Sequence, residues 1–197
     1  MPTYEAQDPH FEARVRGNFA RQSLLRTIGA SLGRVAPGEV EVALPFREDL
    51  CQQHGFIGAG IVTTIADIAC GYAAMSLWGA DADGLTVEFK INFLAPASGE
   101  RLIARGRVAR PGRTISVCAA DVFATSGGQE MLVGTMLATL MRVEHQRPAD
   151  TRNTEERVQL LAGRDVVERR GHARRGWCVC RGRGVRGAIR ELIGHGH

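Results

Sequence analysis

The stretch GAGIVTTIADIACGYAAMSLW, residues Gly58–Trp78, decides the fold of this chain. Its large apolar residues recur at intervals of three and four, as they do on one face of a helix: Ile61, Ile65, Ile68, Tyr72 and Met75. Small and apolar residues occupy most of the remaining positions. A helix that is apolar nearly all round is a buried helix. We therefore expect the rest of the chain to be arranged around this segment.

Asp67 is the exception within this helix, because it is the only charged residue between Gly58 and Ala80. Burying an unpaired carboxylate costs free energy, so such a residue needs a partner or a function. In the structural interpretation, Thr63, Thr64 or backbone groups hydrogen-bond the carboxylate. In the functional one, its surroundings perturb its pKa for catalysis or binding. The pattern alone leaves both interpretations open.

The segments before and after this helix predict a sheet. A helix in one or two pieces around Gly17 is expected from residue 10 to about residue 30. The expected strands are residues 39–44, before the central helix, and residues 85–93, 102–110, 114–123 and 131–143, after it, where short loops join one strand to the next. Strands joined so closely form an antiparallel meander. The chain is therefore expected to be of the α+β class, with one long central helix wrapped by an antiparallel sheet of about five to six strands.

The clearest alternation of apolar and polar residues lies in segment 85–93. Successive side chains of a strand point to opposite faces. The alternation therefore predicts Leu85 and Phe89 on one face and Thr86 and Glu88 on the other.

Composition narrows the class of protein. The chain has 197 residues, of which 44% are hydrophobic, enough for the core of one domain. It has no uninterrupted apolar run of the roughly 20 residues that a membrane span needs, and no pattern of a signal peptide at its start. Its five cysteines are scattered and odd in number. Free thiols in the cytoplasm fit this usage better than a disulfide framework, so a cytoplasmic protein is expected.

Positive charge is concentrated in the last part of the chain. Residues 146–197 contain 12 Arg and six acidic residues in an Arg/Gly-rich composition with few apolar side chains, which predicts disorder. We expect a polar leader at residues 1–9, a folded domain at 10–145 and this tail at 146–197. A single Cys-x-Cys at Cys178 and Cys180 lacks a second pair of zinc ligands. Binding of nucleic acid through the Arg-rich tail is a further hypothesis, but a nucleic-acid partner is not expected, because Trp177 is the tail's only aromatic residue.

Three segments of the folded part carry a resemblance to a known family. They are QQHGFIGAG leading into TTIAD at 52–67, TVEFKINFLAPA at 86–97 and GRVARPGRT at 106–114. In this order they resemble the PaaI-like (phenylacetate-pathway) group of hotdog-fold thioesterases, over about residues 10–143. The resemblance implies a hotdog fold and the hydrolysis of acyl-CoA thioesters without a metal or bound cofactor. It also implies a homodimer or homotetramer with its active sites between subunits.

The resemblance also implies roles for particular residues. Asp67 matches the carboxylate that acts as nucleophile or general base. Ala59 matches the backbone N–H that polarises the thioester carbonyl at the start of the helix, where the helix dipole favours negative charge. Gln52 and Thr86 match the groups that place the attacking water. Independently of the family, Arg110 and Arg113 flank a tight turn and have the geometry to bind CoA phosphates, the alternative being two solvated arginines.

One position departs from the family pattern. Gly58 stands where the family has a His, and His54 lies four residues too early to match it. The backbone donor at Ala59 and the carboxylate of Asp67 are both retained. The missing imidazole favours an alternative function, a hotdog protein that binds acyl-CoA with little or no catalysis.

Overall fold

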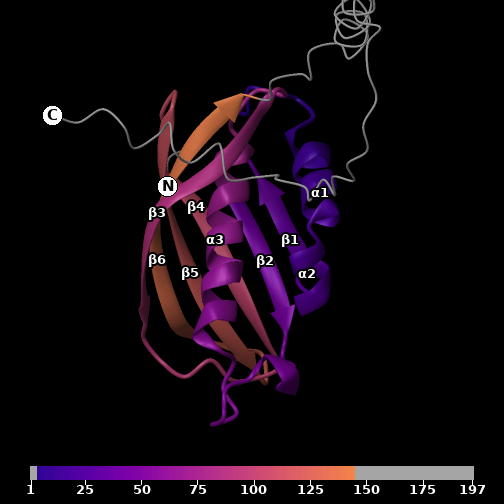
Figure 1. Ribbon diagram of the computed structural model, residues 1–197, viewed down its shortest axis with the longest axis vertical. Coiled ribbons are helices and arrows are strands. Elements are labelled where there is room, and N and C mark those ends of the chain that lie inside the picture. Colours follow the sequence, from indigo (N-terminus) through magenta and orange to yellow (C-terminus); the bar gives the residue numbers. More distant parts are fainter. Residues whose placement is uncertain (1–3, 145–197) are drawn as a thin grey trace, which may run out of the picture. The chain divides into compact units, whose positions relative to one another are not determined.

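A six-stranded antiparallel sheet wraps around the long helix α3, Ala59–Met75, in the computed structural model, which describes residues 4–144 (Figure 1). The strand order is β1-β2-β4-β5-β6-β3. The strands are β1 Ser31–Ala36, β2 Glu39–Pro45, β3 Ala82–Phe93, β4 Arg101–Arg110, β5 Ile115–Ser126 and β6 Gln129–Glu144. The α+β class and the sheet wrapped around one central helix are confirmed. The predicted tail at 146–197 lies outside the described residues.

The N-terminal helical region is broken at a different place from the one expected. Helix α1, Phe11–Arg21, passes through Gly17, and the break falls at Gln22, whose backbone is extended, before the short helix α2, Ser23–Ile28. The strand β1 follows directly and was not predicted. It is short, contains Gly33, and has no fully buried residue, because it is an edge strand that pairs only with β2.

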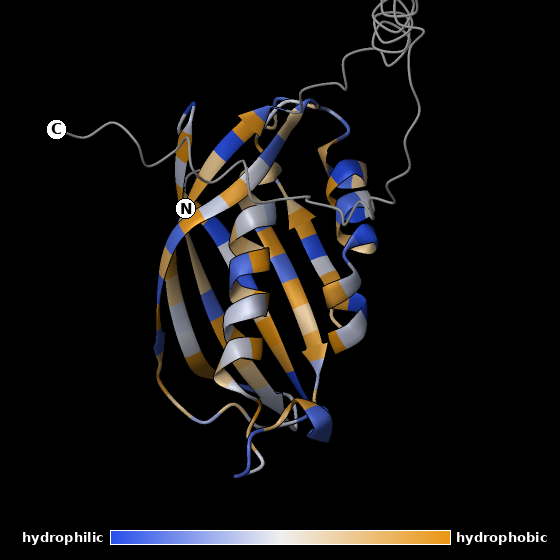
Figure 2. Ribbon diagram, in the orientation of Figure 1, coloured by the Kyte–Doolittle hydropathy of each residue, from blue (hydrophilic) through white to orange (hydrophobic). Residues whose placement is uncertain are grey.

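The hydropathy of the helices agrees with their positions. In Figure 2, α3 is pale to orange along most of its length, whereas α1 shows much more hydrophilic colour. Most of the buried core residues lie on α3 or on the sheet face that packs against it. No helix within residues 4–144 is long and apolar enough to span a membrane.

Helix α3 lies directly on strand β4 at Gly106. A Cβ atom built at Gly106 would lie 2.3 Å from the carbonyl carbon and oxygen of Ala69. Side-chain carbon atoms do not approach a backbone so closely. The absence of a side chain at Gly106 therefore sets the depth at which α3 packs into the sheet.

The C-terminal end of α3 is held by Arg14 of α1. Its guanidinium group donates hydrogen bonds to the carbonyl oxygens of Met75 at 3.1 Å, Trp78 at 2.6 Å and Ala82 at 2.9 Å. It also forms an ion pair with the Asp8 carboxylate at 2.9 Å, and both side chains are largely buried. The last carbonyl groups of a helix lack partners within it, and Arg14 supplies one to Met75, the last residue of α3. The same guanidinium group fixes the segment that follows the helix, at Trp78 and Ala82.

A β-bulge in β3 changes which side chains face α3. The register against β6 shifts between Thr86 and Glu88, so that Thr86 lies opposite Leu140 and Phe89 opposite Ala138. Leu140 and Ala138 are both buried beneath α3. Directly opposite residues project from the same face, so Thr86 and Phe89 both lie on the helix side. The predicted separation of these two residues is wrong, because the extra residue in the bulge reverses the alternation.

The close approach at Gly106 makes a test of the fold. Gly106→Ala is expected to lower the free energy of unfolding by about 3 kcal/mol, because the new methyl group must push α3 away from β4. Urea denaturation followed by circular dichroism measures this change. Gly17→Ala is the control, because a Cβ at Gly17 meets nothing within 4 Å. Equal stabilities of the two variants would contradict the role given to Gly106.

Candidate active site

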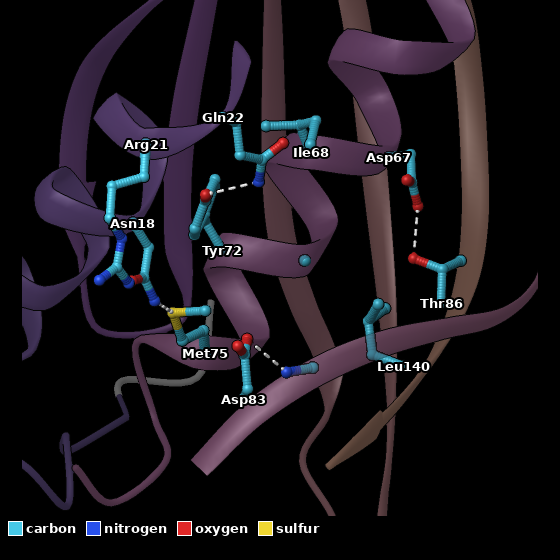
Figure 3. A pocket seen from close by; sticks show the side chains of 12 residues that line it. Asn18, Arg21, Gln22, Asp67, Ile68, Tyr72, Met75, Asp83, Thr86 and Leu140 are labelled. Atoms are coloured by element: carbon cyan, nitrogen blue, oxygen red, sulfur yellow. Dashed lines mark hydrogen bonds between the residues drawn. The ribbon is translucent and has the colours of Figure 1, made fainter. Parts of the chain in front are cut away.

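Among the described residues, the carboxylate of Asp67 has one side-chain hydrogen-bond partner. Thr86 Oγ1 donates a hydrogen bond to Asp67 Oδ1 at 2.7 Å, which joins the middle of α3 to the beginning of β3 (Figure 3). Thr63 and Thr64 do not serve this carboxylate. Their hydroxyl groups donate to the carbonyl oxygens of Ala59 and Gly60, both at 2.8 Å. Neither of the two threonines named in the structural interpretation therefore hydrogen-bonds the Asp67 carboxylate.

The surroundings of Asp67 shift the pKa of its carboxyl group. Burial raises the pKa of the Asp67 carboxyl group, and the hydrogen bond from Thr86 opposes this shift. Within residues 4–144, no salt bridge to Asp67 compensates for the burial. A half-buried carboxyl group with a raised pKa binds and releases protons more readily near neutral pH than an ordinary Asp, as a general base requires.

Asp67 lies in a groove of about 370 Å³. Its walls come from α1 and the α1–α2 junction, from one face of α3, and from the first part of β3. The lining residues are Asn18, Arg21, Gln22, Asp67, Ile68, Gly71, Tyr72, Met75, Asp83, Gly84, Thr86 and Leu140 (Figure 3). The groove therefore extends from the carboxylate towards the C-terminal end of α3.

Ala59 is the first residue of α3 and is exposed. The first hydrogen bonds to the N-cap residue Gly58 come from Ile61 and Val62, whose N–H groups donate to the Gly58 carbonyl oxygen at 2.9 and 3.2 Å. The N–H of Ala59 precedes these bonds and has no acceptor within the helix. An N–H in this position, at the positive end of the helix dipole, suits a developing negative charge on oxygen.

The backbone at Gly58 does not require glycine. Its φ of −59° and ψ of 139° are accessible to any residue. A Cβ at this position would lie 3.5 Å from the carbonyl oxygen of Leu50, which is ordinary contact. The N–H of Gly58 donates to the same oxygen at 2.9 Å and anchors the loop. The backbone and the space at the Cβ therefore do not by themselves require glycine at this position.

Gln52 lies close to Ala59 and apart from Asp67. It begins a tight turn in which its N–H donates to the carbonyl oxygen of Phe56 at 2.9 Å. Gln52 and Ala59 line one hollow together with residues 93–97, whereas Asp67 and Thr86 line the groove described above. Eight residues of helix separate Ala59 from Asp67, which corresponds to about 12 Å along the axis. The predicted site residues thus form two clusters within one chain.

The remaining predicted residues join neither cluster. Arg110 and Arg113 are exposed at the turn between β4 and β5, and Arg110 lies opposite Val117. Neither lines the groove at Asp67 or the hollow at Ala59. The turn is at the same end of the sheet as Thr86, because Thr86 pairs with Leu140 and Leu140 pairs with Ser116.

Sequence reasoning missed the polar residues of the groove. Gln22 Nε2 donates to the Tyr72 hydroxyl oxygen at 2.7 Å, and both residues line the groove beside Asp67. Tyr72 was expected only in the core. Its position one helical turn beyond Ile68, which also lines the groove, was the available signal. Gln22 gave no signal, because it reaches the groove through the break between α1 and α2.

Comparisons with known proteins agree with this fold. The Thioesterase superfamily model matches residues 54–131. A thioesterase family protein of known structure from Silicibacter pomeroyi is 49% identical, with a TM-score of 0.67, and the match covers 68% of this chain and 98% of that one. The structure of the E. coli PaaI protein, from the phenylacetic acid degradation operon, has a TM-score of 0.62 at 17% identity, with 68% and 93% covered. A candidate esterase of Thermoplasma acidophilum is 26% identical over 118 residues, which cover 60% of this chain and 87% of that protein.

The chain belongs to the thioesterase superfamily and has its hotdog fold. The match to the Silicibacter pomeroyi protein carries this assignment, and the likeness to E. coli PaaI is one of fold. The resemblance found in the three sequence segments is thereby confirmed. Membership assigns the chain to thioester hydrolysis as a class of reaction.

The raised pKa of Asp67 predicts a pH-dependent stability. A carboxyl group whose pKa is higher in the folded than in the unfolded state contributes stability below its unfolded pKa of about 3.9, and this contribution is lost as the pH rises through the folded value. Asp67→Asn removes the titration. We expect wild type to lose stability relative to Asp67→Asn as the pH rises from 4 to 7. Urea denaturation at several pH values measures the difference, and a difference that does not change with pH would contradict the raised pKa.

Proposed function

We propose that the protein hydrolyses acyl-CoA thioesters, with Asp67 as general base or nucleophile and the backbone N–H of Ala59 as the donor to the thioester carbonyl. One observation carries the proposal: a half-buried carboxyl group with a raised pKa lies in a groove and has Thr86 as its hydrogen-bond partner. Membership of the thioesterase superfamily supports the class of reaction.

Two chains are needed to complete such a site. The donor at Ala59 and the carboxylate of Asp67 are about 12 Å apart along one helix, too far to act on one carbonyl group. If two copies pair around a twofold axis, Ala59 of one chain faces Asp67 of its partner, and the dimer has two equivalent sites. The proposed active unit is therefore a homodimer, or a homotetramer made of two such dimers.

The surface around β3 supports this pairing. Strand β3 ends the sheet, so one of its edges has no neighbouring strand within the described chain. Large apolar side chains are exposed along it: Val87 is 57%, Phe89 43% and Phe93 49% accessible. An exposed apolar edge strand is a site for pairing with another strand. A second copy of β3 is the proposed partner.

The proposed reaction proceeds in balanced steps. Asp67 takes a proton from a water molecule as the water oxygen bonds to the carbonyl carbon, and the partner's Ala59 N–H stabilises the oxyanion. Gln52 and Thr86 orient the water or the carboxylate. The C–S bond then breaks, and the CoA thiolate leaves and takes the proton from Asp67. If Asp67 attacks directly, the C–S bond breaks as an acyl anhydride forms between the acyl group and Asp67, and the CoA thiolate leaves. Water then hydrolyses the anhydride to the free acid and the Asp67 carboxylate, and the proton released goes to the thiolate. Arg110 and Arg113 are proposed to contact the CoA phosphates.

The test uses two variants that each remove one component. Asp67→Asn removes the base. Ala59→Pro removes only a backbone N–H, because Pro is favoured at the first position of a helix and the extended Gly58 suits a following Pro. With a panel of acyl-CoA esters and thiol release as the readout, each variant is expected to lose about a hundredfold or more in turnover. Thermal unfolding checks that both variants fold.

Mixing the two inactive variants tests the shared site. After unfolding and refolding together, the mixture is expected to recover about a quarter of wild-type turnover, because half of the dimers are mixed and each of these has one intact site. No recovery, with mixed dimers present, would contradict a site shared between subunits. Full activity of Asp67→Asn would contradict the role of the carboxylate.

The second candidate function is acyl-CoA binding without catalysis, and Gly58 is the observation that favours it. The backbone at Gly58 is open to any residue and a Cβ there makes only ordinary contact, so Gly58→His is a suitable variant. If the protein is an enzyme as proposed, Gly58→His is expected to change thiol release by less than about tenfold, since the Ala59 N–H and Asp67 are unchanged. Turnover that appears only in Gly58→His would favour the binding protein.

A further inference from the structure

One guanidinium group joins the end of α3 to the beginning of β3. Arg14 Nη2 donates to the carbonyl oxygen of Met75, the last residue of α3, at 3.1 Å, and to that of Trp78 at 2.6 Å. Arg14 Nη1 donates to the carbonyl oxygen of Ala82, the first residue of β3, at 2.9 Å. The two elements that Arg14 connects are those that carry the carboxylate of the candidate active site and its hydrogen-bond partner.

The guanidinium group is itself held in one orientation. Arg14 Nε donates to Asp8 Oδ2 at 2.9 Å, and the other oxygen of this carboxylate accepts the N–H of His10 at 2.8 Å. The Arg14 side chain is only 14% accessible and that of Asp8 only 7%. A planar fork can reach three carbonyl groups and a carboxylate together, whereas the ammonium group of lysine is a point charge that cannot. The contacts therefore depend on arginine and not on positive charge alone.

Trp78 gives the guanidinium group a second contact with β3. A Cβ built at Gly84 would lie 2.8 Å from a ring carbon of Trp78, so the ring packs directly against the backbone of β3 two residues before Thr86. The hydrogen bond from Arg14 fixes the backbone that carries this ring. Arg14 thus acts on β3 directly, through Ala82, and also through Trp78.

The contacts of Arg14 lie away from the reacting atoms but on the same two rigid elements. Asp67 precedes Met75 by eight residues of helix, about 12 Å along its axis. Thr86 follows Ala82 by four residues of strand, about 13 Å. A change in the spacing of helix and strand at Arg14 is therefore carried to their meeting point, where the hydrogen bond is 2.7 Å long. Such a bond weakens when its atoms move apart by a few tenths of an ångström.

We propose that Arg14 is a positioning residue for the candidate active site: it sets the spacing between α3 and β3 that keeps Thr86 Oγ1 within hydrogen-bonding distance of Asp67. The inference deepens the proposed function and rests on it where it takes Asp67 to be catalytic. Arg14 touches neither the carboxylate nor the groove, and it acts through the two elements that it joins.

The first test follows the titration of Asp67 and needs no turnover. The readout is the carbon-13 NMR signal of the Asp67 carboxyl group, which Asp67→Asn identifies. The hydrogen bond from Thr86 lowers the pKa of Asp67, so Thr86→Val is expected to raise it. Arg14→Lys is expected to raise this pKa in the wild-type chain and to leave it unchanged in the Thr86→Val chain, which has no such bond to weaken. Effects of distant, independent residues would instead add.

Other titratable groups near Asp67 are the same in both backgrounds. Arg21 of α1 and Asp83 of β3 line the groove, and Cys70 and Tyr72 belong to α3 itself. An effect of Arg14→Lys through any of these groups would appear equally with and without Thr86. The difference between the two backgrounds therefore reports the hydrogen bond. Equal shifts in the two backgrounds, or no shift in either, would overturn the inference.

Val15→Ala is the matched control, because Val15 is adjacent to Arg14 on α1 and fully buried. It weakens the packing of α1 and leaves the guanidinium group in place. Val15→Ala is expected to lower the melting temperature and to keep the pKa of Asp67 at its wild-type value. A shift that also depends on Thr86 in Val15→Ala would overturn the inference, because any loosening of α1 would then suffice. If Arg14→Lys does not fold, Asp8→Asn replaces it with the same expected shift.

Thiol release separates this inference from the proposed function. Arg14→Lys is expected to lower kcat about tenfold at nearly unchanged KM, and by less than about twofold in the Thr86→Val chain. Wild type that releases no thiol, with the Thr86-dependent shift present, would keep the positioning role and refute hydrolysis. Wild type that releases thiol, with equal effects of Arg14→Lys in both backgrounds, would keep hydrolysis and refute the positioning role. Absence of both would refute both.

Discussion

The contact between α3 and β4 at Gly106 is the constraint on which the other features depend. The Ala69 backbone occupies the space of a side chain at Gly106, so the helix lies as deep in the sheet as its backbone allows. Asp67 is only two residues from this contact, and the depth of the helix therefore decides how near its carboxylate comes to Thr86 on the far edge of the sheet. Arg14 holds the C-terminal end of the same helix at the Met75 carbonyl oxygen, and the segment that follows it at Trp78 and Ala82. The helix is thus held both in its middle and at its C-terminal end.

The rigid helix carries features that reduce its own stability. The carboxyl group of Asp67, with its raised pKa, and Gly71, a helical glycine without a packing role, both lie on the face that borders the groove. The opposite face is formed by tightly packed small residues, among them Ala66, Ala69 and Ala73. One face of α3 thus packs against the sheet and stabilises the fold, and the other carries the groups of the candidate active site. Such a division is common at functional sites, where a stable framework compensates for groups that are unfavourable by themselves.

The sequence predicted the features that depend on local pattern. The central helix and its exceptional Asp67 follow from periodicity, and the meander follows from turn residues. It did not predict β1, because that strand is formed by its pairing with β2 rather than by its own composition. The alternating pattern predicted the wrong face of the sheet for Thr86, because the bulge is set by the register of β3 against β6. Gln22 reaches the groove only through tertiary packing.

The bulge in β3 has a consequence for the behaviour of the chain in a crowded solution. An edge of 12 residues with exposed apolar side chains is long enough to recruit one strand after another into an open-ended stack. A bulge twists the strand locally and interrupts the regular row of hydrogen-bonding groups, and the charges of Glu88 and Lys90 follow it directly. Unlimited stacking of strands is thereby disfavoured. The irregularity that turns Thr86 towards Asp67 thus also protects the protein against fibrous aggregation.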